Sequence, residues 1–105
     1  MDSVLKALAD ETRRRIVALV WDEDRTAGEI AAQFAMTRPG VSQHLKVLLE
    51  AGVVCVRAAG TRRFYRANPD RVREARLVLE AFWDDRLRHL KRLAEAAQWE
   101  RDNDR

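Results

Sequence analysis

The residues with the clearest chemistry lie on one predicted helix near the middle of the chain, from Thr37 to about Ala51. Its apolar residues recur at helical spacing, at Val41, Leu45, Leu48 and Leu49. Arg38, Gln43 and Lys46 therefore project from the opposite face. Amide and guanidinium groups hydrogen-bond to base edges, and cationic side chains pair with phosphates. The pattern predicts noncovalent recognition of DNA.

Eight side chains are candidates for DNA contact: Thr37, Arg38, Ser42, Gln43, His44, Lys46, Arg62 and Arg63. Gln43 has the amide that pairs with adenine in bidentate fashion, and Ser42 suits a phosphate or a base. Arg38, Lys46 and the helix start at Thr37 suit phosphates. His44 lies between the apolar and polar faces, so both a structural or phosphate-bonding role and a base contact remain open.

The elements that position these residues are predicted from local signals between Thr26 and Val54. Thr26 and Glu29 form a capping-box pattern that begins a helix. Met36 and Thr37 form a turn, and Gly52 can end the next helix in a left-handed conformation. Two short helices joined by a tight turn make a helix-turn-helix, with the recognition helix at about 37–51.

A basic β-hairpin is predicted directly after this motif, over residues 53–67, because the apolar period changes from helical to two residues. Gly60 can take the positive φ of the turn. Four arginines lie on the hairpin: Arg57, Arg62, Arg63 and Arg66. Between Arg38 and Arg66 the chain has six basic residues and one acidic residue, although its net charge is only +3. The hairpin therefore extends the predicted DNA surface as a wing.

The flanking sequence predicts helices from about Ser3, its expected cap, to Ala9, from Asp10 to about Trp21, and over residues 70–98. Residues 99–105 are expected to form a polar tail. At 105 residues the chain suits one domain, here 1–98. The expected fold is mainly α with a small β-hairpin, a winged helix-turn-helix in the order α-α-α-α-β-β-α.

The last helix has an apolar stripe longer than a domain of this size can cover, which predicts a homodimer through the first and last helices. The expected interface residues are Val4, Leu5, Leu8, Leu79, Phe82, Trp83, Leu87 and Leu90.

Nearly the whole chain, from Val4 to about Leu93, resembles the ArsR/SmtB-like winged-helix repressors of bacteria, and among them the SdpR-like branch. The matching segments are LKALADETRRRIVALV, TAGEIAAQF, VSQHLKVLLEAGVV, RRFYRANP and FWDDRLRHL. The resemblance implies a homodimeric transcriptional repressor that binds double-stranded DNA at an inverted-repeat operator.

Metal sensing is common in the family that this chain resembles, but the usual ligands are missing here. The segment EIAAQF contains neither Cys nor His, so no metal or other cofactor is expected. A metal- or thiol-responsive version remains an alternative, through Asp85 and His89 on the last helix and Cys55. Cys55 lies among valines and is expected to fill the core. No effector is identified.

Other function classes fit less well. His44 and His89 have no nucleophile–base–orienter arrangement in the local sequence, and the chain has no Gly-rich phosphate loop, so the sequence does not indicate an enzyme. The N-terminal segment has no long apolar run, so the protein is expected to be cytoplasmic, without a membrane partner. A protein–protein adaptor that uses the winged helix is a further alternative, and its binding would lack the steep salt dependence of DNA binding.

Overall fold

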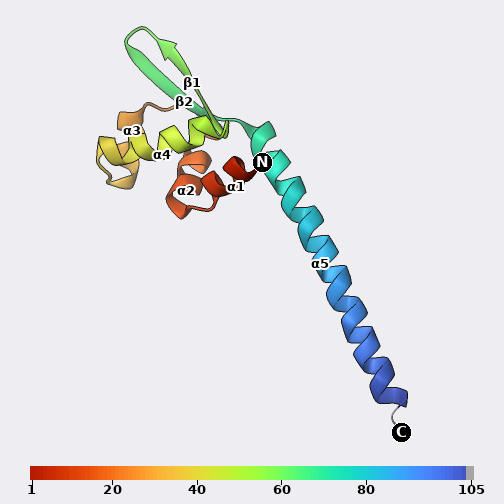
Figure 1. Cartoon of the computed structure of the whole chain (residues 1–105). Coiled ribbons are helices and arrows are strands. Elements are labelled where there is room, and N and C mark those ends of the chain that lie inside the picture. Colours follow the sequence, from red (N-terminus) through yellow and green to blue (C-terminus); the bar gives the residue numbers. More distant parts are fainter. Residues whose placement is uncertain (104–105) are drawn as a thin grey trace. The chain divides into compact units, whose positions relative to one another are not determined.

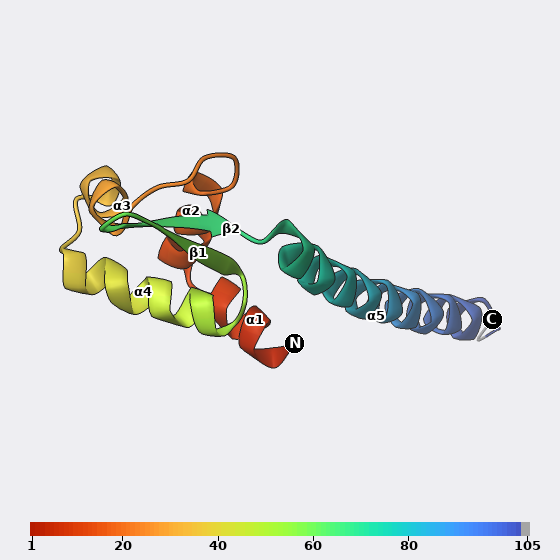
Figure 2. The ribbon, with the colours of Figure 1, turned by 90° about the horizontal axis from the view of Figure 1, so that it is seen from above.

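The computed structural model describes residues 1–103. The elements are α1 (Asp2–Leu8), α2 (Glu11–Leu19), α3 (Ala27–Phe34), α4 (Arg38–Glu50), β1 (Val54–Ala59), β2 (Arg62–Ala67) and α5 (Pro69–Asn103). Figure 1 shows this order along the chain, and Figure 2 shows the same elements from above. The predicted fold class, mainly helical with one β-hairpin in the order α-α-α-α-β-β-α, is confirmed.

The chain divides into two compact units, Met1–Ala75 and the remainder from Arg76. This boundary differs from the predicted single domain over residues 1–98. The first unit ends at Ala75 because this is the last residue with a buried side chain among residues 1–103. Beyond it the chain is one helix, and a lone helix has no core of its own.

The core of the first unit is aliphatic and surrounds α4, which contacts α1, α2, α3 and β1. Its largest fully buried side chains include Ile16, Ile30, Leu45 and Leu48. Each contributes about 1.5–3 kcal/mol by leaving water. Val4 also belongs to this core and is only 2% exposed. Its predicted place in a dimer interface is therefore wrong, because helical spacing puts Val4 and Ala7 on the inner face of α1.

Three of the four predicted helix caps are confirmed. The side chains of Asp10, Thr26 and Thr37 accept hydrogen bonds from backbone N–H groups in the first turns of α2, α3 and α4. Ser3 is not a cap. Helix α1 begins at Asp2, and its N-cap residue Met1 makes no side-chain capping bond. An acidic residue in the first turn favours this earlier start, because it lies at the positive end of the helix dipole.

The hairpin formed by β1 and β2 is antiparallel, with Val54 opposite Ala67 and Ala59 opposite Arg62. Gly60 has φ +63°, as its place in the turn predicted. We call this hairpin the wing. Cys55 is exposed, so its predicted core position is wrong. The cause is strand alternation: Val54 points into the core, and the next side chain points away from it.

Helix α5 continues to Asn103, beyond the predicted end near residue 98, and replaces the predicted polar tail over 99–103. Residues 104–105 of that tail lie outside the described part of the chain. No glycine or proline interrupts the sequence after Pro69, and Ala, Glu, Gln and Arg favour a helix. None of the helices within residues 1–103 has the length and apolar character that crossing a membrane requires.

Candidate nucleic-acid interface

The polar face of α4 is exposed and held in a fixed orientation by its apolar face. Val41, Leu45 and Leu48 are at most 1% exposed. The polar candidates Thr37, Arg38, Ser42, Gln43 and Lys46 are all exposed, and His44 is half-buried. Because the buried side chains anchor the helix along most of its length, the exposed ones occupy defined positions on the surface.

The turn between α3 and α4 sets the direction of the recognition helix. Ala35 ends α3 in a left-handed conformation, with φ 51° and ψ 38°, and the N–H of Met36 donates to the carbonyl of Ala31. Thr37 then caps α4, with its hydroxyl accepting from the N–H of Gly40 at 3.2 Å. The left-handed alanine carried no sequence signal, since glycine is the usual residue at such a helix end.

The wing is held against the loop that precedes α3. Arg25 and Tyr65 exchange two backbone hydrogen bonds, at 3.1 and 2.8 Å, in an isolated β-bridge. Asp24 Oδ2 accepts from Arg57 Nε at 2.8 Å. Asp24 Oδ1 lies 3.2 Å from Arg66 Nε, in an ion pair without hydrogen-bond geometry. The sequence prediction of a basic wing missed that one acidic loop residue, Asp24, pairs with two of its arginines and offsets one of their two charges.

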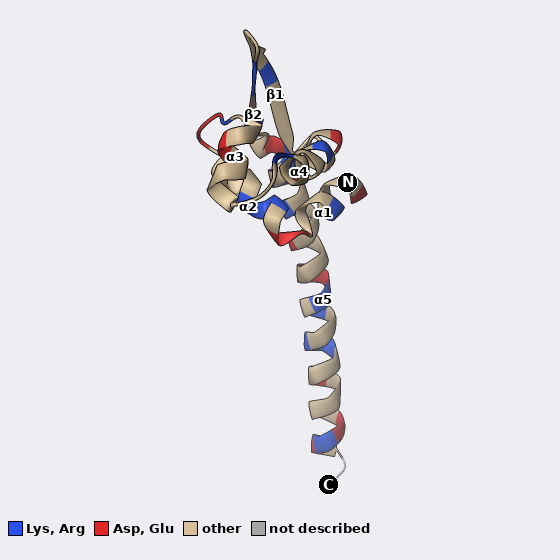
Figure 3. Ribbon diagram, turned by 90° about the vertical axis from the view of Figure 1, so that its left-hand side faces the viewer, with Lys and Arg blue, Asp and Glu red and all other residues tan. Residues whose placement is uncertain are grey.

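The remaining cations of this surface are less neutralised. Arg62 pairs with Glu29 at 3.4 Å. Arg38, Lys46 and Arg63 make no ion pair with any residue in the range 1–103. Figure 3 shows basic segments on both strands of the wing. Unpaired exposed cations are the groups that bind phosphates at least cost, because no internal contact must be broken first.

A groove of about 480 Å³ lies where α3, α4 and the wing meet. Thr26 and Gly28 line it from the start of α3, and Arg38 and Ser42 from α4. Arg62 and Arg63 line it from β2. Sequence reasoning placed Arg38 and the wing arginines on one surface, but it did not predict that they share a groove with the start of α3.

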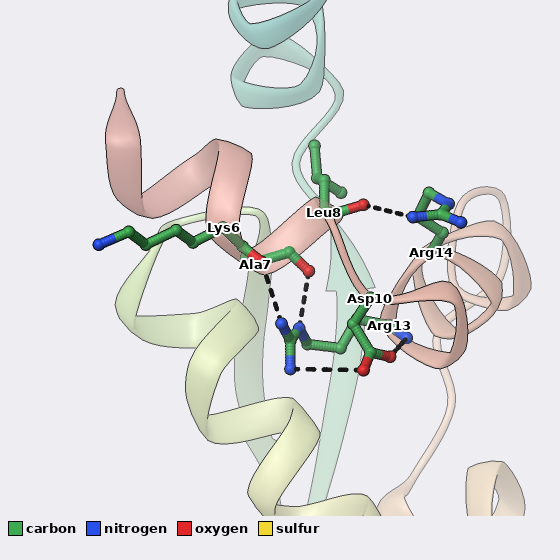
Figure 4. A network of polar contacts seen from close by, with 6 residues as sticks. All are labelled: Lys6, Ala7, Leu8, Asp10, Arg13 and Arg14. Atoms are coloured by element: carbon green, nitrogen blue, oxygen red, sulfur yellow. Dashed lines mark hydrogen bonds and ion pairs between the residues drawn. The ribbon is translucent and has the colours of Figure 1, made fainter.

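A network of polar contacts joins the end of α1 to the start of α2 (Figure 4). The Arg13 guanidinium donates to the carbonyls of Ala7 at 2.7 Å and Lys6 at 2.9 Å, and Arg14 donates to Leu8 at 2.8 Å. The backbone N–H of Arg13 donates to Asp10 and, as the main cause, lowers the pKa of that carboxyl. The charges of Arg13 and His44 lower this pKa further.

The apolar stripe of α5 is exposed in the structure. Leu79, Phe82, Trp83, Leu87 and Leu90 are between 45% and 59% exposed. On α1, Leu5 and Leu8 are half-buried against the core. Asp85 lies 3.8 Å from Arg88, as an ordinary surface ion pair. No group of three or more metal-ligating side chains lies together within the described residues.

A two-helix motif with a polar recognition face, followed by a basic hairpin, defines a winged helix-turn-helix protein. Residues 8–57 match the model of a helix-turn-helix domain family. The chain is 46% identical over 82 residues to the HTH-type transcriptional regulator Rv2034 of Mycobacterium tuberculosis, covering 78% of this chain and 77% of the relative. It is 40% identical over 68 residues to the transcriptional repressor SdpR of Bacillus subtilis, covering 65% and 76%.

The fold has solved counterparts. The homodimeric winged helix-turn-helix DNA-binding domain of Mb0332 from Mycobacterium bovis, described as a possible ArsR-family regulator, has a TM-score of 0.66 and 33% identity. The match covers 76% of this chain and 75% of that one. The chain belongs to the ArsR/SmtB-like family of winged helix-turn-helix transcriptional regulators. It is therefore a DNA-binding regulator of transcription.

Proposed function

We propose that this chain is a homodimeric repressor that binds an inverted-repeat operator with two copies of α4. The observation that carries the proposal is the polar face of α4, which is exposed while Val41, Leu45 and Leu48 anchor the opposite face in the core. A helix held in this way can enter the major groove as a rigid body. The similarity to SdpR, which is named a transcriptional repressor, supports repression.

Gln43 is the proposed base reader of α4. It is exposed, and its amide can both donate to and accept from the edge of adenine. Ser42 precedes it on the same exposed surface and suits a base or a phosphate. Arg38, Lys46 and Thr37 would bind the backbone, which sets the register of the helix in the groove. The half-buried His44 lies closer to the protein interior, which favours a structural or phosphate-bonding role over base contact.

Arg62 and Arg63 are the proposed contacts of the wing with phosphates or the minor groove. Both are exposed and line the groove beside Arg38 and Ser42. Arg57 and Arg66 are weaker candidates because Asp24 already pairs with them.

A dimer through α5 is supported by the exposed apolar stripe, since five large side chains in one row are costly to leave in water. The homodimeric state of the Mycobacterium bovis neighbour supports it as well. Leu5 and Leu8 on α1 would join this interface. A two-fold axis would present two α4 helices to successive major grooves, roughly 34 Å apart.

The proposal is tested by selecting bound fragments from the source genome at near-physiological salt. We expect enrichment of inverted repeats whose half-sites are about 10 base pairs apart, centre to centre. Binding to the selected duplex should weaken steeply with salt. Enrichment of single half-sites would contradict the dimeric operator. Binding without salt dependence would instead support a protein–protein adaptor.

The same selection is repeated with Zn²⁺, with a chelator and with an oxidant. We expect the same fragments each time, because Asp85 and His89 have no third ligand among the described residues. A change with Zn²⁺ that disappears in His89→Ala would support the metal-responsive alternative. A change with oxidant that disappears in Cys55→Ser would support the thiol-responsive one.

A further inference from the structure

The groove between α3, α4 and the wing gathers three arginines from two distant parts of the sequence. Arg38 comes from the first turn of α4, and Arg62 and Arg63 come from the start of β2. A Cβ atom added at Gly28 would lie 3.9 Å from the Arg38 guanidinium, so that side chain lies directly over the start of α3. Three guanidinium groups around one hollow repel one another unless an anion lies between them.

The only acidic partner of these three arginines within residues 1–103 is Glu29. Its Oε1 atom accepts from the Thr26 hydroxyl at 3.2 Å and from the Arg62 guanidinium at 3.4 Å. Both side chains of the Glu29–Arg62 pair are largely exposed, at 44% and 62%. A long, solvated ion pair of this kind contributes little free energy and can be exchanged for another anion.

The chemistry of the groove selects a phosphate group. Guanidinium forks bind phosphate oxygens in bidentate fashion. The first N–H groups of α3, at Ala27 and Gly28, lie at the positive end of the helix dipole and lack intrahelical acceptors. Ser42 also lines the groove, one residue before the proposed base reader Gln43. This proximity favours a phosphate of the DNA backbone over a free anion.

We propose that the groove binds one backbone phosphate in each half-site, and that Glu29 competes with this phosphate for Arg62. The proposal rests on the DNA-binding function proposed above and deepens it. In the free protein Glu29 holds Arg62. On binding, the phosphate takes its place, and Glu29 keeps its contact with Thr26. Glu29 thereby lowers the affinity of the protein for every DNA sequence. Nonspecific and specific complexes are both weakened.

The first test is Glu29→Gln, measured on the selected duplex and on an unrelated duplex. Glutamine keeps a side-chain oxygen that can accept from the Thr26 hydroxyl, but it removes the charge. We expect about two- to fivefold tighter binding to both duplexes, which is the equivalent of breaking a weak surface ion pair. The matched control is Glu11→Gln, which makes the same change in charge at an exposed residue paired with Arg15 on α2. Equal effects of the two substitutions would overturn the proposal.

A double-mutant cycle separates competition from long-range repulsion. Arg62→Ala should weaken binding, and the gain from Glu29→Gln should then be smaller than the gain in the wild-type background. Removing Arg62 leaves the general repulsion between Glu29 and DNA intact, but it removes the pair that must be exchanged. A gain from Glu29→Gln that is the same with and without Arg62 would show repulsion alone and would overturn the competition.

Neutral methylphosphonate substitution locates the phosphate. Each phosphate of the selected duplex is replaced in turn, and the affinity is measured for the wild type and for the Arg38→Ala, Arg62→Ala double variant. At one position per half-site, the replacement should cost the wild type much affinity and the double variant little. Equal losses in both proteins at every position would overturn the phosphate site.

Inorganic phosphate and pyrophosphate distinguish a free anion from the DNA backbone. At matched ionic strength we expect neither to change DNA binding by more than chloride does. If pyrophosphate binds and the groove variants abolish that binding without affecting DNA affinity, the assignment to DNA is overturned. A wild type that binds no DNA at low salt would refute the proposed function itself, whereas unchanged DNA binding by the groove variants would refute only this site.

Discussion

Single side chains on α4 divide into anchors and readers according to where the helix buries them. Gln43 lies between the anchors Val41 and Leu45 in sequence, but it points to the opposite side and is exposed. Helical geometry alone therefore separates the residues that stabilise the domain from the exposed residues that we propose select its DNA.

Gln43→Ala should relax discrimination at one or two base positions by about 1–3 kcal/mol, because a bidentate amide contact to adenine is lost. The measurement is affinity for operator variants substituted one base at a time. Gln33→Ala, at an exposed glutamine of α3, is the matched control. Unchanged selectivity in the Gln43 variant would exclude it as a base reader.

Asp10 links stability to pH through its hydrogen bond with the Arg13 backbone. Its pKa is lowered in the folded chain, so its ionised form contributes stability that is present above the unfolded pKa, about 3.9. This contribution is lost as the pH falls through the lower folded pKa. Asp10→Asn keeps a capping oxygen and removes the charge. The difference in urea midpoint between wild type and this variant should shrink below about pH 4; a constant difference down to pH 2 would contradict the linkage.

The orientation of α4 depends on the tight turn after α3, and the position of the wing depends on its contacts with the loop before α3. Ala35 adopts the left-handed conformation that ends α3, although it has a Cβ atom. Asp24 and Arg25 fix the base of the wing through side-chain and backbone contacts, respectively. The turn and these contacts together restrict where α4 and the arginines of the wing can lie.

Ala35→Gly should stabilise the fold by about 0.5–1 kcal/mol, because glycine adopts the left-handed region without steric cost. Ala32→Gly, in the body of the same helix, should destabilise it by about 1 kcal/mol. Urea unfolding followed by circular dichroism measures both. If both substitutions raise or both lower the free energy of unfolding, left-handed strain at Ala35 does not determine the effect of the glycine.

For the whole molecule, the exposed apolar row on α5 is the feature that links assembly to DNA binding in the proposed function. A single recognition helix covers too few base pairs for a tight specific complex, so two must act together. The proposed function therefore requires that loss of the dimer also lowers operator affinity.

Leu90→Asp should shift sedimentation toward the monomer and weaken operator binding together, because it places a charge in the proposed apolar interface. Arg92→Asp is the control. Residue 92 lies about 200° around the helix from residue 90, so a larger change in charge there should leave the dimer intact. A wild type that sediments as a monomer at micromolar concentration would refute the dimer.

Local signals in the sequence determined the element order, the caps at Asp10, Thr26 and Thr37, the turn at Gly60 and the two faces of α4. Each depends on interactions within a few residues or on simple periodicity. The same signals failed at Ser3, because α1 begins earlier, at Asp2, where an acidic side chain suits the positive end of the helix dipole.

Only the tertiary structure decided which of the chain's charges and apolar groups meet. The pairing of Asp24 with Arg57 joins residues more than thirty positions apart, so it depends on how the wing packs against the loop before α3. The groove shared by Gly28, Arg38 and Arg62 has the same origin. Long-range pairing is set by the summed packing of the whole core, which no local pattern encodes, so the basic surface could be predicted but not its internal competitor Glu29.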